Sequence, residues 1–435
     1  MMGQELHGAS FPLALRKHLD GDLAAAEAIY RQLIHDAVDE AQARHYLGFL
    51  LQQSGRLQEA VEQLTAAIVL DDSHAEWHFN LGIALLRQGL AAASIEALNH
   101  AIAIDPGKYF YWTNMGAAFE ANQEHARAEQ CYRVAMDLDP DSPDAYYLLA
   151  ALCLQQQRFD EARHFNHRGI VAAPADSTSK LMRGQAYYEL GRTDDAIALF
   201  EDWLRNEPHN AVAAHLLAAY RGQQVPHQCS SEYVEQTFDA FAKTFENVLG
   251  RLKYSGPRLV QEHLAALDIP AAGLRVLDLG CGTGLVGEVL QPHARELVGV
   301  DLSRAMLDQA AAKHLYRQLH RSGIVEFLRA SHDRYDLVAC MDTLTYFGKL
   351  EEVFTLIWRN LEPGGLLLFS TEKLSGAYEC DYRLNVSGRY SHHQDYLAAV
   401  LDAAGFAIRK MADVAIRNES GCPIEGQFVC ASRRA

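Results

Sequence analysis

Small and apolar residues in the first half of the chain recur with a period of 34 residues. One column of small residues lies at Ala14, Gly48, Gly82, Gly116, Ala150 and Gly184. A second small column follows twelve residues later, at Ala26, Ala60, Ser94, Ala128, Ala162 and Ala196. Large residues form a third column, broken at Asn166, with Tyr30, Leu64, Leu98, Tyr132 and Phe200. Prolines share a fourth, at Pro106, Pro140, Pro174 and Pro208. This spacing predicts two packed helices of about a dozen residues per unit, with proline at the turn between units.

The 34-residue pattern resembles the tetratricopeptide repeat. In this register six repeats begin near His7, Ala41, Ala75, Tyr109, Pro143 and Ser177, and a further helix over 211–221 covers the last one. A solenoid of this kind presents a concave groove that binds an extended peptide or another protein. The array could instead serve as a spacer or a dimerisation surface. Residues 1–225 hold 17 Lys and Arg against 30 Asp and Glu, so we expect a basic partner segment.

The pattern changes after 222–226, where the 34-residue register ends. The aromatic segment from Tyr233 to Tyr254 has the spacing of an amphipathic helix. Continuous apolar runs separated by helical stretches then predict strands at 275–279, 296–301, 337–340, 366–369, 407–416 and 427–431. Runs of this kind form a parallel sheet that helices cover on both faces. A short turn with Gly and Pro joins the last two runs, so an antiparallel hairpin is expected at the edge.

The first predicted strand ends in an acid followed by a glycine-rich turn. Asp278 lies two residues before the turn at 280–284, and Asp301 ends the next strand. The glycines from Gly282 to Gly287 also fit a dinucleotide-binding turn, which leaves a nicotinamide cofactor as an alternative. However, an acid at 278 would repel a pyrophosphate but hold an α-amino group, while Asp301 is placed to accept both ribose hydroxyls. The two acids therefore predict S-adenosylmethionine.

Four segments resemble the motifs of class I methyltransferases. They are Val276 to Gly284, Val298 to Leu307, Tyr335 to Phe347, and Leu361 to Gly365. The whole chain is similar to bacterial predicted methyltransferases with N-terminal tetratricopeptide repeats, a likeness that includes 238–242, 388–392 and 417–423. The resemblance implies an all-α solenoid over 1–225 and a Rossmann-like α/β domain over 226–435. The sheet of that domain is expected to be mostly parallel and seven-stranded, with an antiparallel edge. S-adenosylmethionine-dependent methyl transfer is implied as well.

The helix at the start of the second domain resembles a lid that closes over cofactor in related enzymes. We expect this role for Tyr233, Phe238 and Phe241, although the helix could instead only dock the two domains. One departure is Gly323, where related sequences carry an acid for the adenine amino group. Adenine is then expected to meet backbone and apolar groups near Gly323 and Ile324. The residues predicted to bind the cofactor are Asp278, Gly280, Cys281, Gly282, Gly284, Asp301, Leu302, Met306, Gly323, Ile324, Met341, Tyr233 and Phe241.

Methyl transfer requires an aligned nucleophile, exclusion of water and, for a protonated nucleophile, a base. We predict candidates for these roles in the loops after the fourth and fifth strands. His392 is the first candidate for the base, because a neutral imidazole accepts a proton. Tyr346 could position the substrate, and Glu372, just beyond the fifth strand, could orient an amine or pair with a cation. The predicted substrate-binding residues are Arg389, which could instead tie down its own loop, Tyr390 and His393.

Composition limits the class of partner. The net charge of −17 supplies no excess of cations for nucleic acid or an anionic membrane. No apolar run reaches the roughly 18 residues of a membrane span. The eight cysteines have neither CxxC pairs nor zinc-ligand spacing, so no metal is expected. A cytoplasmic location is predicted.

Three functions remain open on the sequence. In the first, the repeats recruit a protein or peptide that receives the methyl group. In the second, the acceptor is a small molecule or a carrier-bound acyl group, and the repeats serve assembly. In the third, the protein binds S-adenosylmethionine without turnover, as an interaction scaffold. The acceptor atom, the partner and the oligomeric state are not specified by the sequence.

Overall fold

The computed structural model describes residues 10–223, 225–267, 272–376, 379–419 and 421–434. The chain divides into two compact units, Met1–Arg192 and Thr193–Ala435. Helices α12 (Thr193–Asn206) and α13 (Ala211–Arg221) belong to the second unit, although their sequences continue the repeat pattern. The domain boundary at 225/226 stays a prediction, and the predicted start of the first repeat, His7, lies outside the described residues.

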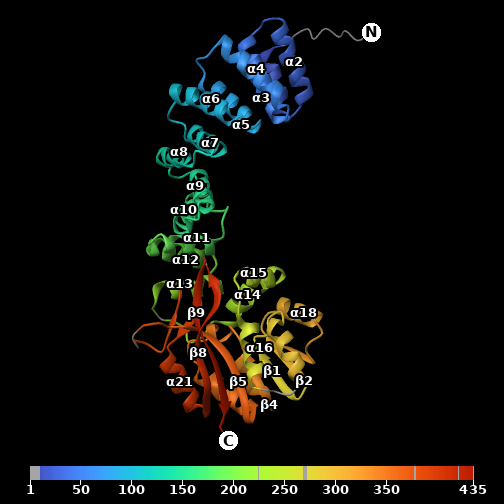
Figure 1. The fold of residues 1–435 in the computed structure, drawn as a ribbon, viewed down its shortest axis with the longest axis vertical. Helices are drawn as coiled ribbons and strands as arrows, with labels where there is room; N and C mark the ends of the chain where they lie inside the picture. Colours follow the sequence, from blue (N-terminus) through green and yellow to red (C-terminus); the bar gives the residue numbers. More distant parts are fainter. Residues whose placement is uncertain (1–9, 224, 268–271, 377–378, 420, 435) are drawn as a thin grey trace. The chain divides into compact units, whose positions relative to one another are not determined.

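Over its described residues, the first unit consists of five antiparallel helix pairs, one pair per repeat, followed by the first helix of the sixth repeat (Figure 1). The helices are α1 (Phe11–Leu19), α2 (Leu23–His35), α3 (Glu40–Gln53), α4 (Leu57–Leu70), α5 (Ala75–Arg87), α6 (Ala91–Ile104), α7 (Tyr109–Ala121), α8 (His125–Leu138), α9 (Asp144–Gln155), α10 (Phe159–Ala172) and α11 (Lys180–Glu189). These bounds confirm the predicted two helices per 34-residue period.

Within each pair the small column packs against the large column. A Cβ built at Gly48 would lie 2.6 Å from Cγ of Leu64, and one at Gly82 would lie 2.7 Å from Cγ of Leu98. Both distances are too short for a real side chain, so the glycine lets the two helices approach. The large residues Leu64 and Leu98 are completely buried there. The close approach predicted from the spacing is therefore present.

The first helix of each repeat ends in a residue with left-handed backbone. These residues are again 34 positions apart, with φ between 61° and 82°, at Gly21, Gly55, Gly89, Gln123, Gln157 and Gly191. A left-handed residue after a helix redirects the chain and returns its amides to the last carbonyls of that helix. At Gly89, for example, the amide donates to the Leu86 carbonyl at 2.9 Å. Each turn between helices is thus encoded locally.

The second unit contains one mixed sheet. Its strands are β1 (Leu274–Leu279), β2 (Ala294–Asp301), β3 (Gln318–Arg321), β4 (Tyr335–Cys340), β5 (Leu361–Lys373), β6 (Tyr382–Leu384), β7 (Tyr390–His392), β8 (Phe406–Glu419) and β9 (Cys422–Arg433). The strands from β3 through β2, β1 and β4 to β5 are parallel neighbours, whereas β9 is antiparallel to both β5 and β8. The predicted parallel sheet with an antiparallel hairpin is confirmed.

The sheet has nine described strands rather than the seven expected, because short strands β6 and β7 extend it beside β5. Two predicted positions change as a result. Glu372 lies within β5, not beyond it, because that strand continues to pair with β9 and β7. His392 lies in β7 rather than in a loop.

Helices cover the sheet on both faces, and alternate strand residues reach the two cores. Leu277 and Leu279 of β1 belong to the core that contains residues of α19 (Ile324–Ala330), α20 (Glu351–Asn360) and α21 (Gln394–Ala403). Val276 belongs to the other core, with residues of α16 (Gly256–Ala266) and α17 (Leu285–Leu290). This alternation is what a strand buried on both faces requires.

The helices of the second unit, besides α12 and α13, fall between and before these strands. They are α14 (Ser231–Phe241), η1 (Ala242–Thr244), α15 (Phe245–Arg251), α16 (Gly256–Ala266), α17 (Leu285–Leu290), η2 (Gln291–His293), α18 (Arg304–Ala312), α19 (Ile324–Ala330), η3 (Leu344–Tyr346), α20 (Glu351–Asn360) and α21 (Gln394–Ala403). The single helix predicted over 233–254 is divided at η1. There the side chain of Gln309 donates to the Ala242 carbonyl at 2.7 Å, which takes that carbonyl out of a regular helical ladder.

Among the described residues, no helix is long and apolar enough to cross a membrane. The same residues contain no group of His, Cys, Asp and Glu side chains arranged to hold a metal ion.

Candidate active site

A tight glycine turn joins β1 to α17 at the carboxyl end of the parallel strands. Positive φ angles of 71°, 53° and 87° occur at Gly280, Gly282 and Gly284. The amides of Gly280 and Cys281 donate to the Val300 carbonyl, at 2.8 and 3.1 Å, and hold the turn against β2. A side chain at position 280 would overlap Thr343, so both the conformation and the space require glycine there.

Asp301 ends β2 beside this turn. Its Oδ2 accepts a hydrogen bond from the Gly282 amide at 2.9 Å, and its Oδ1 accepts one from the Ser303 amide at 2.8 Å. Burial raises the pKa of the Asp301 carboxyl, and these backbone bonds oppose the rise. Each oxygen keeps another lone pair, so the carboxylate can also accept hydrogen bonds from ligand hydroxyls.

Asp278 ends β1 on the other side of the turn and is only 1% exposed. Its Oδ2 accepts a hydrogen bond from the Tyr316 hydroxyl at 2.7 Å. Burial raises the pKa of Asp278 to about 7, against the opposing effect of the Tyr316 hydrogen bond. A buried carboxylate whose hydrogen-bond donor is a neutral phenol favours a cationic ligand group.

The helix that is expected to act as a lid is attached to the start of α18, which follows β2. Asp239 of α14 accepts hydrogen bonds from the Ser303 hydroxyl and the Ala305 amide, at the start of α18. Phe245 of α15 lies over the glycine turn, with its ring 3.8 Å from the position of a Cβ at Gly282.

Two other residues predicted for the lid face different surroundings. Tyr233 is buried, and its ring lies 4.1 Å from the ring of His215 in α13. Phe238 packs edge-to-face against Tyr346, with ring centroids 5.5 Å apart. The side chain of Phe241 lies outside the described part of the chain. Cofactor contact by these residues stays a prediction.

The remaining predicted cofactor residues lie where neighbouring strands end. Leu302 follows β2, and Met306 is buried in the first turn of α18. Gly323 and Ile324 begin α19 after β3, and Met341 follows β4. Because parallel strands end at a common edge, these residues share one edge of the sheet with the glycine turn.

An acid does occupy the region of Gly323, although not at that sequence position. A Cβ built at Gly323 would overlap Oε2 of Glu326, so the Glu326 side chain reaches back over the glycine. The sequence signal is an acid three residues after the residue that caps a helix, the spacing at which a side chain returns to the cap. Glu326 is not among the residues predicted from the sequence.

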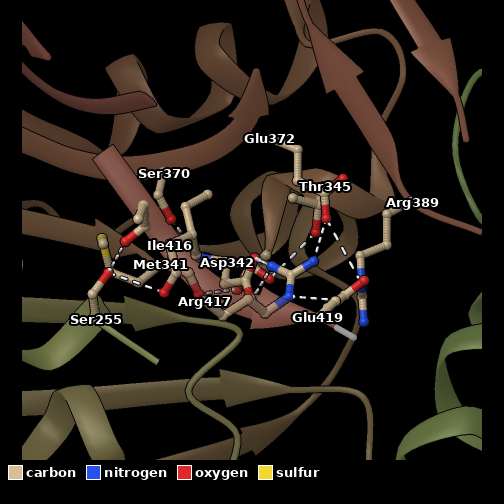
Figure 2. Close-up of polar contacts among 12 residues, drawn as sticks. Ser255, Met341, Asp342, Thr345, Ser370, Glu372, Arg389, Ile416, Arg417 and Glu419 are labelled. Carbon is tan, nitrogen blue, oxygen red and sulfur yellow. Dashed lines mark hydrogen bonds and ion pairs between the residues drawn. The ribbon is translucent and has the colours of Figure 1, made fainter. Parts of the chain in front are cut away.

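At the carboxyl ends of β4 and β5 lies a partly buried group of charged residues that we call the ion-pair cluster: Asp342, Glu372, Glu419, Arg389 and Arg417 (Figure 2). Arg417 of β8 is 2% exposed and lies at its centre. Its guanidinium donates to both oxygens of Asp342, at 2.8 and 3.0 Å, to Glu419 at 2.8 Å, and to Glu372. Arg389 forms ion pairs with Glu419 and, at 3.7 Å, with Glu372. One arginine thus joins β4, β5 and β8.

Burial raises the pKa of the Glu372 carboxyl even though Arg417 and Arg389 oppose that rise. The Asp342 backbone is left-handed, with φ of 53°, and its amide donates to the Ser370 hydroxyl at 2.8 Å. Left-handed backbone in a residue other than glycine persists only where its surroundings hold it. The bidentate contact with Arg417 is one such restraint.

Of the predicted catalytic residues, His392 lies in β7, which pairs with β5, and Tyr346 lies in η3, which follows β4. Their environments differ. His392 is completely buried, and its Nε2 lies 3.1 Å from the Gly348 carbonyl. Burial lowers the pKa of His392 to about 4. Tyr346 is half-buried, and burial raises the pKa of its hydroxyl, while Arg389 has the opposite effect. Their catalytic roles stay predictions.

The predicted substrate-binding residues Arg389, Tyr390 and His393 lie in β7 or directly next to it. The Tyr390 hydroxyl donates to the Pro226 carbonyl at 2.6 Å, and His393 Nδ1 accepts a hydrogen bond from the Asp395 amide at 3.2 Å as the cap of α21. Arg389, as described above, contacts Glu372 and Glu419. Each of the three predicted substrate-binding residues therefore contacts another residue of the chain, and their role in binding substrate stays a prediction.

Helix α13 holds the loop that carries Arg389. His215 Nε2 lies 2.9 Å from the Gly388 carbonyl, and the Cys229 thiol lies 3.4 Å from the same nitrogen. Gly388 has a φ of 79°, and a side chain there would overlap Tyr233. The last helix of the repeat pattern is thus packed into the second unit beside the ion-pair cluster.

A pocket of about 380 Å³ opens at the carboxyl end of β5. Its lining is mostly polar and includes Glu372, Lys373, Asn385, Ser391, Glu419 and Ile424. Two acids of the ion-pair cluster therefore also face this pocket.

Sequence analysis did not single out Arg417, Asp342 or Tyr316 as site residues. An arginine at the end of an apolar strand was the available signal for Arg417, since a buried guanidinium needs acidic partners. Asp342 follows the fourth strand, where site residues gather in such sheets. Nothing in the local sequence links Tyr316 to Asp278, 38 residues earlier.

Comparison with known proteins identifies both parts of the chain. A family model described as a methyltransferase domain matches residues 251–410. Models of the tetratricopeptide repeat match 47–109, 120–180, 165–211 and 181–221. The chain thus carries tetratricopeptide repeats followed by a methyltransferase domain, as the sequence motifs predict.

Individual relatives share only part of the chain. The ubiquinone biosynthesis O-methyltransferase of Coxiella burnetii is 33% identical over 107 residues, which cover 24% of this chain and 46% of that protein. The biotin biosynthesis bifunctional protein BioHC of Saccharophagus degradans is 32% identical over 136 residues, or 30% of this chain and 24% of that protein. The structure of magnesium protoporphyrin IX methyltransferase from Synechocystis, with bound SAH, has a TM-score of 0.37 and 17% identity, and covers 47% of this chain and 99% of that one. The chain spans less than half of the curated relatives named here.

Proposed function

We propose that the chain is an S-adenosylmethionine-dependent methyltransferase whose repeats recruit a protein or peptide acceptor. The observation that carries the proposal is the pair Asp278 and Asp301, which end adjacent parallel strands on either side of the glycine turn. Neither carboxylate has an arginine or lysine as its hydrogen-bond donor among the described residues. They are therefore suited to a ligand that brings an ammonium group to one and hydroxyls to the other.

The residues present fit this cofactor by their chemistry. Asp278 is a buried acid that gains from a cationic partner, and Asp301 retains lone pairs for ribose hydroxyls. Phe245 lies over the turn, while Asp239 attaches the proposed lid helix to the start of α18. When bound, S-adenosylmethionine supplies an electrophilic methyl group on sulfur.

On the acceptor side, the protein has to align a nucleophile and take up its proton where it carries one. Glu372 is supported for proton uptake because it lines the pocket beside β5 and because burial raises the pKa of its carboxyl. Tyr346 could orient the acceptor, since it follows β4 at the same edge of the sheet. His392 has no exposed surface, and its Nε2 faces a backbone carbonyl, which favours a supporting role.

A small polar acceptor is the second candidate. The observation that favours it is the pocket itself, which is too small for a folded protein but suits one side chain or one small metabolite. In that case the repeats serve assembly. The cofactor site is the same for both candidates. They differ only in whether a protein side chain or a small molecule reaches Glu372.

The first test is calorimetry with S-adenosylmethionine and S-adenosylhomocysteine on the full chain. We expect both to bind, and Asp301→Ala to reduce the affinity for both at least about a hundredfold. The second test adds cofactor with an isotopic methyl group to lysate. Label in macromolecules that disappears when the chain is shortened to 193–435 supports a recruited protein, and label in small metabolites supports the second candidate. Absence of cofactor binding would overturn the proposal.

A further inference from the structure

Tyr316 fills a space that two glycines and the glycine turn leave open. It lies in the loop between α18 and β3. A Cβ at Gly287 would overlap the Tyr316 hydroxyl and lie 2.6 Å from Cζ of the ring, and a Cβ at Gly299 would lie 2.9 Å from the ring. A Cβ at Gly284, in the turn itself, would lie 3.1 Å from Cε2. Any larger residue at these positions would therefore press on the tyrosine ring, so three elements of the donor side are shaped around one side chain.

The ring ends in the hydroxyl that donates to Asp278 at 2.7 Å. No other donor among the described residues reaches this carboxylate, and its Oδ1 carries no hydrogen bond from them. The other titratable groups that interact with Asp278 are Asp301, Cys281, Cys340 and Tyr254. Asp301 is the only carboxyl among them, and its negative charge, when it is ionised, repels that of Asp278 and raises the pKa of Asp278.

Taking the proposed function as given, we infer that Tyr316 is a positioning residue for the methyl donor. Its hydroxyl holds Oδ2 of Asp278 and thereby turns Oδ1 toward the α-amino group of the cofactor. The same hydrogen bond stabilises the ionised carboxylate that the ammonium group requires.

The inference assigns a direction to the effect of pH. Burial favours the protonated form of Asp278, whereas the Tyr316 hydroxyl favours the carboxylate. Removal of the hydroxyl therefore extends protonation of Asp278 to higher pH. Affinity for a ligand with an ammonium group is lost as pH falls through the pKa of Asp278, so the variant should lose affinity at a higher pH than the wild type.

The test is calorimetry of S-adenosylhomocysteine binding to wild type and Tyr316→Phe from about pH 6 to about pH 9. The phenylalanine keeps the ring among its glycines and removes only the hydroxyl. We expect about a tenfold loss of affinity near neutral pH that diminishes as pH rises. Tyr335→Phe is the matched control, because Tyr335 is also buried but begins β4, at the opposite end of the parallel strands. It should leave the affinity and its pH profile unchanged.

Other outcomes would overturn the inference. A loss of affinity that is the same at every pH would show that the hydroxyl does not act through the ionisation of Asp278, which the inference requires. Tighter binding by the variant would mean that the hydroxyl competes with the ligand for Asp278. Equal binding by variant and wild type would remove the tyrosine from the donor site but leave the proposed function intact. Only a wild-type chain that binds neither form of the cofactor would overturn both, and thermal unfolding of each variant verifies that it is folded.

Discussion

Two groups of carboxylates in the second unit have opposite surroundings. Asp278 and Asp301, at the glycine turn, form the proposed donor side, and the ion-pair cluster forms the proposed acceptor side. Asp278 and Asp301 receive hydrogen bonds from a phenol and from backbone amides, all of which are neutral. In the ion-pair cluster, Asp342 and Glu372 instead face Arg417. Neutral donors leave negative charge available to a cationic ligand, whereas arginines cancel it. The donor side is thus built to attract charge, and the acceptor side to hold a rigid frame.

The two sides also differ in what supports them. Asp278, the glycine turn and Asp301 belong to one continuous strand–turn–helix–strand segment, and the two acids accept hydrogen bonds from that segment and from the loops after β2 and α18. The acceptor side joins β4, β5 and β8 through Arg417 and depends on α13 through His215 and Gly388. We therefore expect changes on the acceptor side to reach further through the fold.

The largest effect is expected from Arg417→Met. The change leaves three buried or half-buried acids without their shared partner, and breaking a buried ion pair in this way costs about 3–5 kcal/mol. Urea unfolding measures the loss in free energy of unfolding. Arg409→Met, on the same strand, removes only a hydrogen bond to Ser432 and should cost less than about 1.5 kcal/mol. Equal losses for the two variants would contradict a special role of the cluster.

The second prediction concerns the donor side. Asp278→Asn should reduce affinity for S-adenosylhomocysteine at least about a hundredfold, because the amide has no charge for the ammonium group. The ligand-free protein should nevertheless become more stable at high pH. The pKa of Asp278 is about 7 in the folded protein, above the ordinary 3.8, so the stability it contributes at low pH is lost as pH rises through about 7.

Asp278→Asn has no carboxyl to ionise, so it avoids this loss in the free energy of unfolding. The loss is at most about 4 kcal/mol for a pKa difference of about three. Thermal unfolding at about pH 5 and about pH 8 measures the gain, and calorimetry measures the affinity. Asp308→Asn, an exposed residue of α18, is the control and should change neither quantity. If Asp278→Asn is no more stable than the wild type at high pH, ionised Asp278 does not destabilise the fold.

A third, smaller effect tests the dependence on α13. His215→Ala removes the hydrogen bond to the Gly388 carbonyl and leaves a buried gap, at a cost of about 1–3 kcal/mol. Affinity for S-adenosylhomocysteine should stay within about twofold of the wild type, because His215 makes no hydrogen bond to Asp278, Asp301 or the glycine turn among the described residues. Chemical unfolding and calorimetry provide the two values. His209→Ala, an exposed residue before α13, should alter neither, and a large loss of affinity in His215→Ala would connect the two sides.

The smallest effect is expected from Glu326→Ala. If the Glu326 carboxylate accepts a hydrogen bond from the adenine amino group, its removal should weaken cofactor binding about three- to tenfold. The double change Gly323→Asp with Glu326→Ala returns an acid to this place and removes the overlap at position 323. Calorimetry should show recovery of affinity in the double variant. Unchanged affinity in Glu326→Ala would leave adenine to the apolar and backbone contacts expected from the sequence.

The differences between the two sides explain what the sequence could predict. The 34-residue columns predicted the repeat helices, because each repeat contact joins residues only 16 positions apart, as in Gly48 with Leu64. The donor side was predictable for a similar reason: Asp278, the glycine turn and Asp301 follow one another along the chain. Arg417 contacts partners 45 and 75 residues away, and no local pattern encodes such contacts. Strands β6 and β7, with three residues each, are too short to give a hydrophobic period.

The left-handed residue that recurs from Gly21 to Gly191 makes the first helix of every repeat end in the same way. A segment of 34 residues could therefore be duplicated or lost between two such points without disturbing the helices on either side, because each repeat packs only against its neighbours. The number of repeats could change in fixed steps during evolution while the glycine turn and its two acids stayed the same. If the repeats recruit the acceptor, as proposed, then acceptor choice and methyl chemistry are free to evolve separately.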